Sequence, residues 1–368
     1  MTSERPRARA LRLLRATAAE PIAAGLPLPP ERLLADQYQV SRTTIRWALA
    51  QLAREGLLRN VTGRTRLVAD PSARPAMACH PVYVFSQIEE SQVNRSEGWG
   101  GNVHVGLLNA MRSLGHAVLI PGSSLLDEAT VACLLRERPA GVLIPEPMYT
   151  GASDPSLMLA AEAFAKAGIP TVVFGEFPAA CDRVCSDHEL GAHLLSTWLL
   201  NRGRRHQLCL WPGPSTPAWL ERRRIGHERA LREGGVAIRP VEWMNWLSRD
   251  EDFETLVLAL AGHLAPHLLS AQPIDSILAM IDGHVPAICA ALRHCGREPG
   301  RDIDVVGYDA LWAECPQRLL CPVPPAASID KCNLQIGKAM ATLLDERMAG
   351  ILPPEPQLRQ IAPRLAFN

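Results

Sequence analysis

Residues 41–57 read SRTTIRWALAQLAREGL, and this stretch decides the fold of the N-terminal part of the chain. Ser41 is a good helix N-cap, because its hydroxyl can accept from a free N–H of the first turn. Apolar residues then follow at i, i+3, i+4 and i+7, which is the spacing of one buried helix face: Ile45, Ala48, Leu49 and Leu52. The opposite side of the same helix must face outward: Thr43, Arg46, Trp47 and Ala50.

The flanking sequence supplies the rest of a small domain. Residues 8–19 and 31–38 have the pattern of two further helices, and Gln39-Val40 is a tight connection to the helix that begins after Ser41. After Gly56, two apolar pairs at 57–58 and 67–68 bracket a polar tip at 60–64, as in a short hairpin. We predict a winged helix-turn-helix over residues 1–70, followed by a linker at 71–80.

The charge distribution agrees with a domain that binds a polyanion. The whole chain has 368 residues and is neutral, with 38 basic and 38 acidic side chains. Residues 1–75 alone contain 13 arginines, no lysine and 6 acidic residues, a net charge of +7, so the remainder carries −7. A basic head on an acidic body favours nucleic-acid binding, although a solvated arginine-rich face gives the same balance.

The predicted third helix presents the side chains that read DNA in such a fold. Its N-terminal residues would lie against base edges, where Arg42 and Arg46 can pair with guanine and Thr43 can reach a phosphate or a thymine methyl. The first-turn N–H groups after Ser41 favour a phosphate. At the wing tip, Gly63 and Arg64 can approach the minor groove or the backbone.

The head resembles the GntR-type winged helix. The resemblance rests on an ordered series of motifs: LPPERLLA at 28–35, VSRTTIR at 40–46, Ala48-Leu49, Leu52, EGL at 55–57 and Gly63-Arg64. It implies DNA contacts at Arg32, Arg42, Thr44, Arg46 and Gly63. This chain departs from the family in three places: Pro30 replaces a serine, Gln39 replaces the glycine of the turn, and Thr65 replaces the second glycine of the wing.

From residue 81 the pattern changes to apolar strands that alternate with helices. The expected strands are 82–85, 117–120, 141–144, 171–174, 207–211, 276–280 and 304–308. The expected helices are 103–114, 127–137, 157–167, 188–201, 220–233, 252–264 and 285–295. This alternation predicts an α/β fold with parallel strands, arranged as one large sheet or as two doubly wound halves.

The body resembles the LacI/GalR-type effector-binding core, which has the periplasmic-binding-protein fold. The motifs that carry this resemblance are Asp187-x-x-x-Gly191, Asn201-Arg-Gly203, Arg223-x-x-Gly226, VVGYD at 305–309, Ile336-Gly337 and IAPRL at 361–365. The resemblance implies two lobes joined by three crossovers, with a ligand between them. We expect lobe 1 at about 81–183 and 316–352, and lobe 2 at about 184–313 and 355–368. Together with the head, the chain resembles the arabinose-repressor type of regulator.

The same resemblance implies the effector-binding residues. Arg223 and Asp309 match its ligand-binding arginine and aspartate, and a guanidinium with a carboxylate suits the hydroxyls of a polyol. Asp282 matches the aspartate of an Asn-Asp pair in which Ile281 replaces the asparagine. Aromatic rings stack well on sugars, so we add Trp99 and Trp312, although tryptophan is also a common core residue.

Several other classes of protein find no support in the sequence. No apolar run approaches a membrane span and no signal peptide is evident, so we expect a cytoplasmic protein without a membrane partner. The ten cysteines form no C-x-x-C pair and suggest reduced thiols. No catalytic or nucleotide-binding motif occurs, so we expect no enzyme and no cofactor. Two histidine pairs, His188 with His193 and His263 with His267, are expected to be surface or core residues rather than metal ligands.

These observations favour a ligand-responsive transcriptional regulator, most simply a repressor. Its head would bind operator DNA, and its body would form a homodimer and bind a sugar or a sugar derivative. The rival interpretation is a cytoplasmic sugar-binding or sugar-processing protein whose basic head is incidental. A transport receptor needs an export signal and a sugar enzyme needs catalytic residues, and neither is evident.

Overall fold

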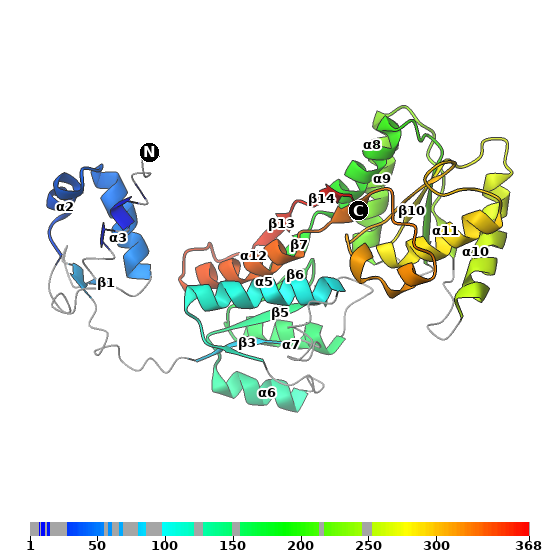
Figure 1. The fold of residues 1–368 in the computed structure, drawn as a ribbon. Coiled ribbons are helices and arrows are strands. Elements are labelled where there is room, and N and C mark those ends of the chain that lie inside the picture. The colour runs from blue at the N-terminus through cyan, green and yellow to red at the C-terminus, as the bar shows by residue number, and fades with distance from the viewer. Residues whose placement is uncertain are drawn as a thin grey trace. The chain divides into compact units, whose positions relative to one another are not determined.

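The computed structural model describes residues 7, 9–11, 13–14, 28–54, 58–60, 66–68, 80–85, 98–120, 128–148, 155–212, 217–244 and 252–367 (Figure 1). The chain divides into two compact units, Met1–Cys79 and His80–Asn368, which we describe separately. The first unit holds helices and a short hairpin, and the second is built on parallel sheets. The α/β class predicted from the sequence is therefore confirmed.

The first unit has the elements of a helix-turn-helix with a wing. Helix α2 spans Glu31–Tyr38 and α3 spans Arg42–Arg54, and strands β1 (Leu58–Asn60) and β2 (Arg66–Val68) pair antiparallel. Within the predicted first helix at 8–19, the described residues 9–11 and 13–14 are helical, and residue 7 before it is helical too. One core joins these segments, and it includes Ala10, Leu14, Leu34, Tyr38, Ile45, Ala48, Leu49, Leu52 and Leu58.

The turn between α2 and α3 has a backbone conformation that favours glycine, the residue that the GntR-type family has at the position of Gln39. Gln39 has φ 52° and ψ 49°, in the left-handed region that glycine adopts at least cost. Its side-chain Nε2 donates to the carbonyl of Asp36 at 2.8 Å, which supports this conformation locally. The departure at Gln39 therefore leaves the turn geometry intact.

The first lobe of the second unit is a six-stranded parallel sheet. Its strand order is β13-β7-β6-β5-β3-β4. The bounds are β3 Val82–Val84, β4 Val118–Leu119, β5 Gly141–Met148, β6 Thr171–Gly175, β7 Asp182–Ser186 and β13 Leu358–Ile361. Helices α5 (Gly98–Leu114) and α12 (Asn333–Met348) pack together on one face, and α6 (Glu128–Glu137) and α7 (Pro155–Lys166) lie on the other (Figure 1).

Alternation along the strands gives this sheet two separate cores. Val82 and Val84 face α5 and α12, whereas Tyr83 and Phe85 face α7, where the ring of Phe85 stacks on Phe164 at 5.6 Å. Burial on both faces explains why the strands read as continuous apolar runs in the sequence.

The second lobe is a four-stranded parallel sheet with helices on both faces. Its order is β11-β10-β8-β9. The strands are β8 (Gln207–Pro212), β9 (Glu242–Met244), β10 (Ser276–Ala279) and β11 (Asp304–Val306). The helices are α8 (His188–Asn201), α9 (Ala218–Glu233), α10 (Phe253–Leu268) and α11 (Val285–His294). Two further strands, β12 (Ser328–Asp330) and β14 (Arg364–Ala366), form an antiparallel pair beside α8.

The strand pattern allowed one large sheet or two doubly wound halves, and the structure has two separate parallel sheets. All seven predicted strands occur, and they divide into two doubly wound halves. The expected lobe boundaries need two corrections. Residues 316–330 were placed in lobe 1, but Cys321 and Val323 pack in the core of the second lobe and β12 lies beside α8. Residues 184–186 and 358–361 were placed in lobe 2. Strand β7 pairs with β6, and β13 pairs with β7, so both strands extend the first sheet. Their sequences, DRVCS and LRQI, mix charged and apolar residues and lack the apolar run by which the other strands were found.

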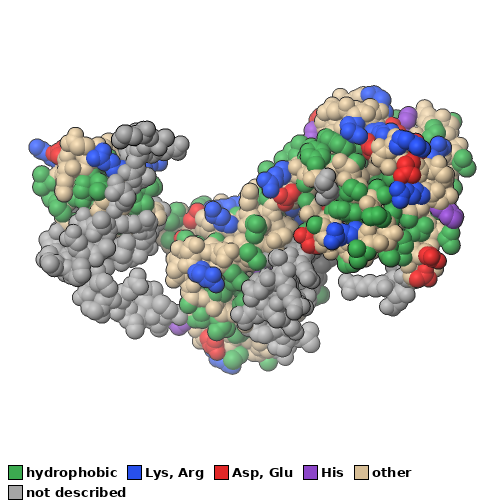
Figure 2. All heavy atoms as spheres, in the orientation of Figure 1, with side chains coloured by type: hydrophobic (Ala, Val, Ile, Leu, Met, Phe, Trp, Pro, Cys, Tyr) green, Lys and Arg blue, Asp and Glu red, His purple; other side chains and the backbone are tan. Residues whose placement is uncertain are grey.

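The surface of the second lobe carries charges of both signs. Figure 2 shows basic and acidic side chains interspersed on the visible face rather than gathered in one patch. Ion pairs along α9 account for part of this pattern, since Arg224 pairs with Glu221 and with Glu228. No helix in the described ranges is long and apolar enough to cross a membrane.

Candidate functional site

The side of α3 that was predicted to contact DNA is exposed, and its opposite side is buried. Ser41 caps α3, because its Oγ accepts from the backbone N–H of Thr44 at 3.1 Å. Ile45, Ala48, Leu49 and Leu52 are all at most 2% exposed. The predicted contact residues on the other side are exposed or half-buried: Arg32, Ser41, Arg42, Thr43, Thr44 and Arg46. Gly63 and Arg64 at the wing tip lie outside the described residues.

Arg46 has a protein partner in this structure. Its Nε and Nη2 both donate to Oε2 of Glu31, at 3.3 and 3.1 Å, and the arginine side chain is 63% exposed. Glu31 begins α2, so this pair ties the two helices together on the exposed side of the head. A DNA phosphate or base that takes Nε and Nη2 of Arg46 must replace this carboxylate.

Trp47, which the sequence places on the outward side of α3, is partly covered in the structure. The indole is half-buried and packs against the core of the head. The guanidinium of Arg7 lies over its ring, 5.3 Å from the centroid. Trp47 therefore joins the N-terminal helical residues to α3 and contributes a cation–π contact.

In the second unit, Arg223 is the centre of a buried polar cluster. It is only 4% exposed, and its Nη1 donates to the carbonyl of Met280 at 2.7 Å. Its guanidinium carbon lies 4.6 Å from the ring centre of Trp219 and 3.3 Å from that of Tyr308. Nη2 lies 3.8 Å from Oδ1 of Asp309. The two effector residues expected from the sequence are thus neighbours, although 86 positions separate them.

Asp309 is shared between two cations. Its Oδ1 lies 2.9 Å from Nζ of Lys331, closer than to Arg223. The backbone of Asp309 has φ 92°, and Ala310 after it has φ 53°, so the chain turns sharply at the end of the VVGYD motif. Left-handed backbone at a non-glycine residue costs about 1–3 kcal/mol and is found preferentially where a side chain must be held in place. Here it holds the carboxylate toward Arg223 and Lys331.

His188 completes the cluster as a neutral imidazole. It is 4% exposed at the start of α8, and its Nδ1 accepts from Nε of Arg223 at 3.4 Å. Burial, followed by the charges of Arg223 and Lys331, lowers the pKa of His188 well below its usual value. Its ring also lies 5.8 Å from that of Trp219. The cluster therefore offers two cations, one carboxylate and aromatic surface within a small region.

Two close helix contacts hold this cluster in place. A Cβ on Gly226 would lie 2.0 Å from the carbonyl oxygen of Glu189, so α9 can approach α8 this closely only with glycine at that position. A Cβ on Gly191 would lie 2.2 Å from the hydroxyl of Tyr308. The glycines of the Arg-x-x-Gly and Asp-x-x-x-Gly motifs thus set the distances between Arg223, His188 and Tyr308.

The surroundings of Asp282 differ from those of the ligand-binding residue that we expected. It is 1% exposed, and both its oxygens are engaged within the protein. Oδ1 accepts from the hydroxyl of Ser328 and Oδ2 from the N–H of Leu311, each at 2.7 Å. Asp282 therefore fixes the loop that carries Asp309 against β12. Its part in the site is to position other residues.

The buried carboxyl of Asp282 gives a pH prediction. Burial raises its pKa to about 6, from an ordinary value near 4. A raised pKa means that the folded state holds the proton more tightly, so this stabilising contribution is present below about pH 4 and is lost as pH rises through 6. Between pH 4 and 7 the parent should therefore lose about 2 kcal/mol relative to Asp282→Asn, which does not titrate. Urea unfolding of both proteins across this range measures the difference, and two parallel curves would contradict it.

The two tryptophans proposed for the effector site are not equivalent. Trp99 lies in the first turn of α5, and its side chain is outside the described part of the structure. Trp312 is half-buried and packs against the core of the second lobe, close to the loop fixed by Asp282. Trp219, rather than either of these, contacts Arg223. Its position four residues before Arg223, on one face of the same helix, is the signal that would have found it.

Arg222 connects the two lobes beside the cluster. Its Nε lies 2.6 Å from Oε1 of Glu176, which follows β6 in the first lobe, whereas Arg222 belongs to α9 in the second. Two consecutive arginines on α9 thus have different partners, since Arg222 pairs with the other lobe and Arg223 with its own.

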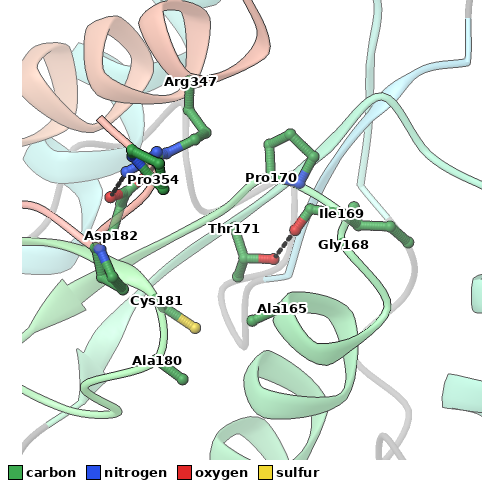
Figure 3. Close-up of a pocket in the computed structure, with 11 residues that line it drawn as sticks. Ala165, Gly168, Ile169, Pro170, Thr171, Ala180, Cys181, Asp182, Arg347 and Pro354 are labelled. Carbon is green, nitrogen blue, oxygen red and sulfur yellow. Dashed lines mark hydrogen bonds and ion pairs between the residues drawn. The ribbon is translucent and has the colours of Figure 1, made fainter. Parts of the chain in front are cut away.

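One pocket among the described residues lies away from this cluster. It has a volume of about 220 Å³ and is formed at the amino ends of β6 and β7, where Thr171 and Asp182 begin these strands (Figure 3). Asp182 is fully engaged there, accepting from Nε and Nη2 of Arg347 and from the N–H of Gln357, each at 2.7 Å. Figure 3 shows Arg347 reaching Asp182 across the pocket wall. The Arg347–Asp182 ion pair anchors α12 to the sheet, and the pocket contains none of the predicted site residues.

Comparison with protein-family models identifies both units. Residues 10–68 match the model of bacterial regulatory proteins of the gntR family, and residues 197–367 match the periplasmic binding protein-like domain. The chain joins a GntR-type winged helix to a periplasmic-binding-protein-like domain. The resemblances inferred from the sequence motifs are confirmed for the head and the body.

Individual relatives agree with this assignment. The HTH-type transcriptional repressor NagR of Bacillus subtilis (strain 168) is 44% identical over 52 residues, which are 14% of this chain. The chain matches about a fifth, 21%, of the length of that relative.

Solved structures share the fold of the body at low identity. A LacI-family regulator from Enterococcus faecium, solved with bound ribose, has a TM-score of 0.55 at 16% identity, covering 78% of this chain and 96% of that one. A LacI-family regulatory protein from Chloroflexus aggregans has a TM-score of 0.59 at 18% identity, covering 77% and 95%. The regulator CelR in complex with cellobiose has a TM-score of 0.58 at 20% identity, covering 92% and 98%.

Proposed function

We propose that this GntR-type regulator is a transcriptional repressor whose binding to operator DNA is controlled by a sugar or related polyol. The observation that carries the proposal is the Arg223 cluster, in a chain whose head presents arginines on an exposed, capped helix. A guanidinium, an ammonium and a carboxylate beside an indole match a ligand with many hydroxyls and an apolar ring face. Structural neighbours solved with ribose and cellobiose support the same class. Such a regulator acts in the cytoplasm, where its operator lies.

Operator binding is tested with Arg46→Ala. Loss of one good base contact should cost about 1–3 kcal/mol, roughly a fivefold to 150-fold weaker affinity. A gel shift at fixed salt with the DNA upstream of the protein's own gene measures it. Arg112→Ala is the matched control, because Arg112 is an exposed arginine of the other unit. Equal affinity of parent and Arg46→Ala, with the fold intact, would show that α3 is placed wrongly on the DNA. It would favour the rival function, a cytoplasmic sugar-binding or sugar-processing protein.

The Glu31–Arg46 pair gives a prediction of the opposite sign. Glu31→Gln should raise operator affinity, by about threefold to tenfold, because it frees Arg46 and removes a negative charge from a surface that faces phosphates. The gain should disappear in the double variant with Arg46→Ala, since the released arginine is then absent. An unchanged or weaker affinity of Glu31→Gln would mean that Glu31 instead holds Arg46 in its reading position.

The small size of the head bears on the oligomeric state of the protein. A single winged helix contacts few base pairs, and pairing two heads raises the local concentration of the second one. We therefore include a homodimer and a near-palindromic operator in the proposal. Light scattering with and without DNA at micromolar protein concentration tests it, and a monomer in both conditions would contradict it.

A further inference from the structure

Three side chains that could ligate a metal ion come together on the second lobe, outside the Arg223 cluster. Glu242 begins the edge strand β9, and His263 and His267 lie on α10. The two histidines are one helical turn apart, at i and i+4, so they share a face of α10. That face lies against Glu242, and the ligating atoms of all three residues are within 4.8 Å of one another.

The distances between the two histidine Nε2 atoms and the carboxylate oxygens of Glu242 are too long for hydrogen bonds. They are close to the distances between two ligand atoms of the same bound metal ion. Nε2 of His263 lies 3.7 Å from Oε2 of Glu242, and Nε2 of His267 lies 3.6 Å from Oε1. Both distances lie well beyond the range of about 2.7–3.2 Å in which most N–H···O hydrogen bonds fall. Two ligands at about 2.0–2.1 Å from a tetrahedral zinc ion are separated by about 3.3–3.4 Å. The carboxylate already presents one oxygen to each imidazole at nearly this spacing.

One ligating atom needs a partner. Nε2 of His263 is shielded from solvent, and it makes no hydrogen bond with any residue that the structure describes. A buried polar atom left unpaired costs about 1–3 kcal/mol, so native proteins pair nearly all such atoms with protein, water or an ion. An ion between His263, His267 and Glu242 would satisfy this nitrogen.

We propose that Glu242, His263 and His267 form a binding site for a divalent transition-metal ion of the zinc class. Two imidazole nitrogens and a carboxylate oxygen suit zinc better than the all-oxygen sites of calcium or magnesium. Three protein ligands leave one position for water. The bound ion links β9 to α10 and stabilises the edge of the second-lobe sheet. The site is independent of the effector cluster and adds metal binding to the proposed function.

Calorimetric titration of metal-free, full-length protein with zinc chloride tests this site. We expect about one equivalent to bind to the parent, and the affinity of Glu242→Gln and of His267→Gln to fall at least tenfold. His294→Gln is the matched control, because it removes an exposed histidine from α11 of the same lobe. Circular dichroism of each variant shows whether it is folded. The two ligand variants change different elements, so if one of them misfolds, the zinc affinity of the other still tests the site.

Cobalt(II) separates this site from zinc bound by cysteine. The described cysteines are free thiols, and Cys133 is exposed, so thiolate binding is the competing source of a calorimetric signal. Cobalt held by nitrogen and oxygen ligands lacks the intense near-ultraviolet charge-transfer band of cobalt–thiolate sites. A weak visible spectrum that disappears in Glu242→Gln is expected. A thiolate band, or equal zinc affinity in the parent and both ligand variants, would overturn the proposal.

Discussion

Arg223→Ala is expected to weaken binding of the effector at least tenfold, while leaving operator affinity without effector unchanged. The guanidinium contributes charge-assisted hydrogen bonds worth about 1.5–3 kcal/mol each, and it covers the faces of Trp219 and Tyr308. Arg223→Lys should recover little, because an ammonium keeps the charge but cannot reproduce the planar stacking and the fork of donors. Calorimetry with the sugar identified by a thermal-shift screen measures both variants.

The neighbouring residue on the same helix supplies the control for this experiment. Arg224→Ala removes an arginine that pairs with Glu221 and Glu228 on the surface of α9, so effector affinity should stay at the parental value. Parental affinity in Arg223→Ala would exclude Arg223 from the effector site. Loss of both effector and DNA binding in Arg223→Ala would show that the cluster serves to hold the body together.

Gly337→Ala is expected to destabilise the second unit by about 3 kcal/mol. A Cβ at this position would lie 2.0 Å from the carbonyl oxygen of Val103 and 2.6 Å from the amide nitrogen of Leu107. Both atoms belong to the backbone of α5, so no side-chain rotation relieves the clash and α12 must move away. Overpacking of this kind commonly costs about 1–3 kcal/mol, and rigid backbone neighbours place it at the upper end. Urea unfolding followed by far-UV circular dichroism measures the loss.

Gly262→Ala provides the matched control for the same chemical change. Gly262 also lies inside a helix, α10, but a Cβ there meets nothing within 4 Å. Alanine should therefore stabilise the protein by about 0.5–1 kcal/mol through its higher helix propensity. If both variants shift stability by the same amount and in the same direction, the close contact between α5 and α12 is not the cause.

The elements with a strong periodic signal were predictable from the sequence. Strands buried on both faces are continuous apolar runs, and α3 combines a serine cap with a complete helical face, so both could be placed from residue patterns alone. Short strands of mixed polarity, such as β7 and β13, could not be found this way, because their positions depend on pairing with strands already in the sheet. The omission of these strands caused the misplacement of residues 184–186 and 358–361.

The candidate site was predictable only where a motif or a strand end marked a residue. Arg223 and Asp309 were found because both lie in motifs, Arg-x-x-Gly and VVGYD, by which the body resembles the LacI/GalR-type core. Lys331 and His188 lie far from them in the sequence and join the cluster only through the tertiary fold. Asp282 occupies the same kind of strand end as Asp309, and only the hydrogen bonds from Ser328 and Leu311 reveal its positioning role.

The stacking of Trp219 against Arg223 gives the protein a built-in optical reporter. An indole close to both a guanidinium and an imidazole has an emission that depends on the placement of both groups, and Trp219 is held there by α9 itself. A ligand that draws Arg223 toward its own hydroxyls changes the surroundings of this ring. The difference in fluorescence between the parent and Trp219→Phe then isolates one indole among eight tryptophans, and occupancy of the cluster can be followed without a label.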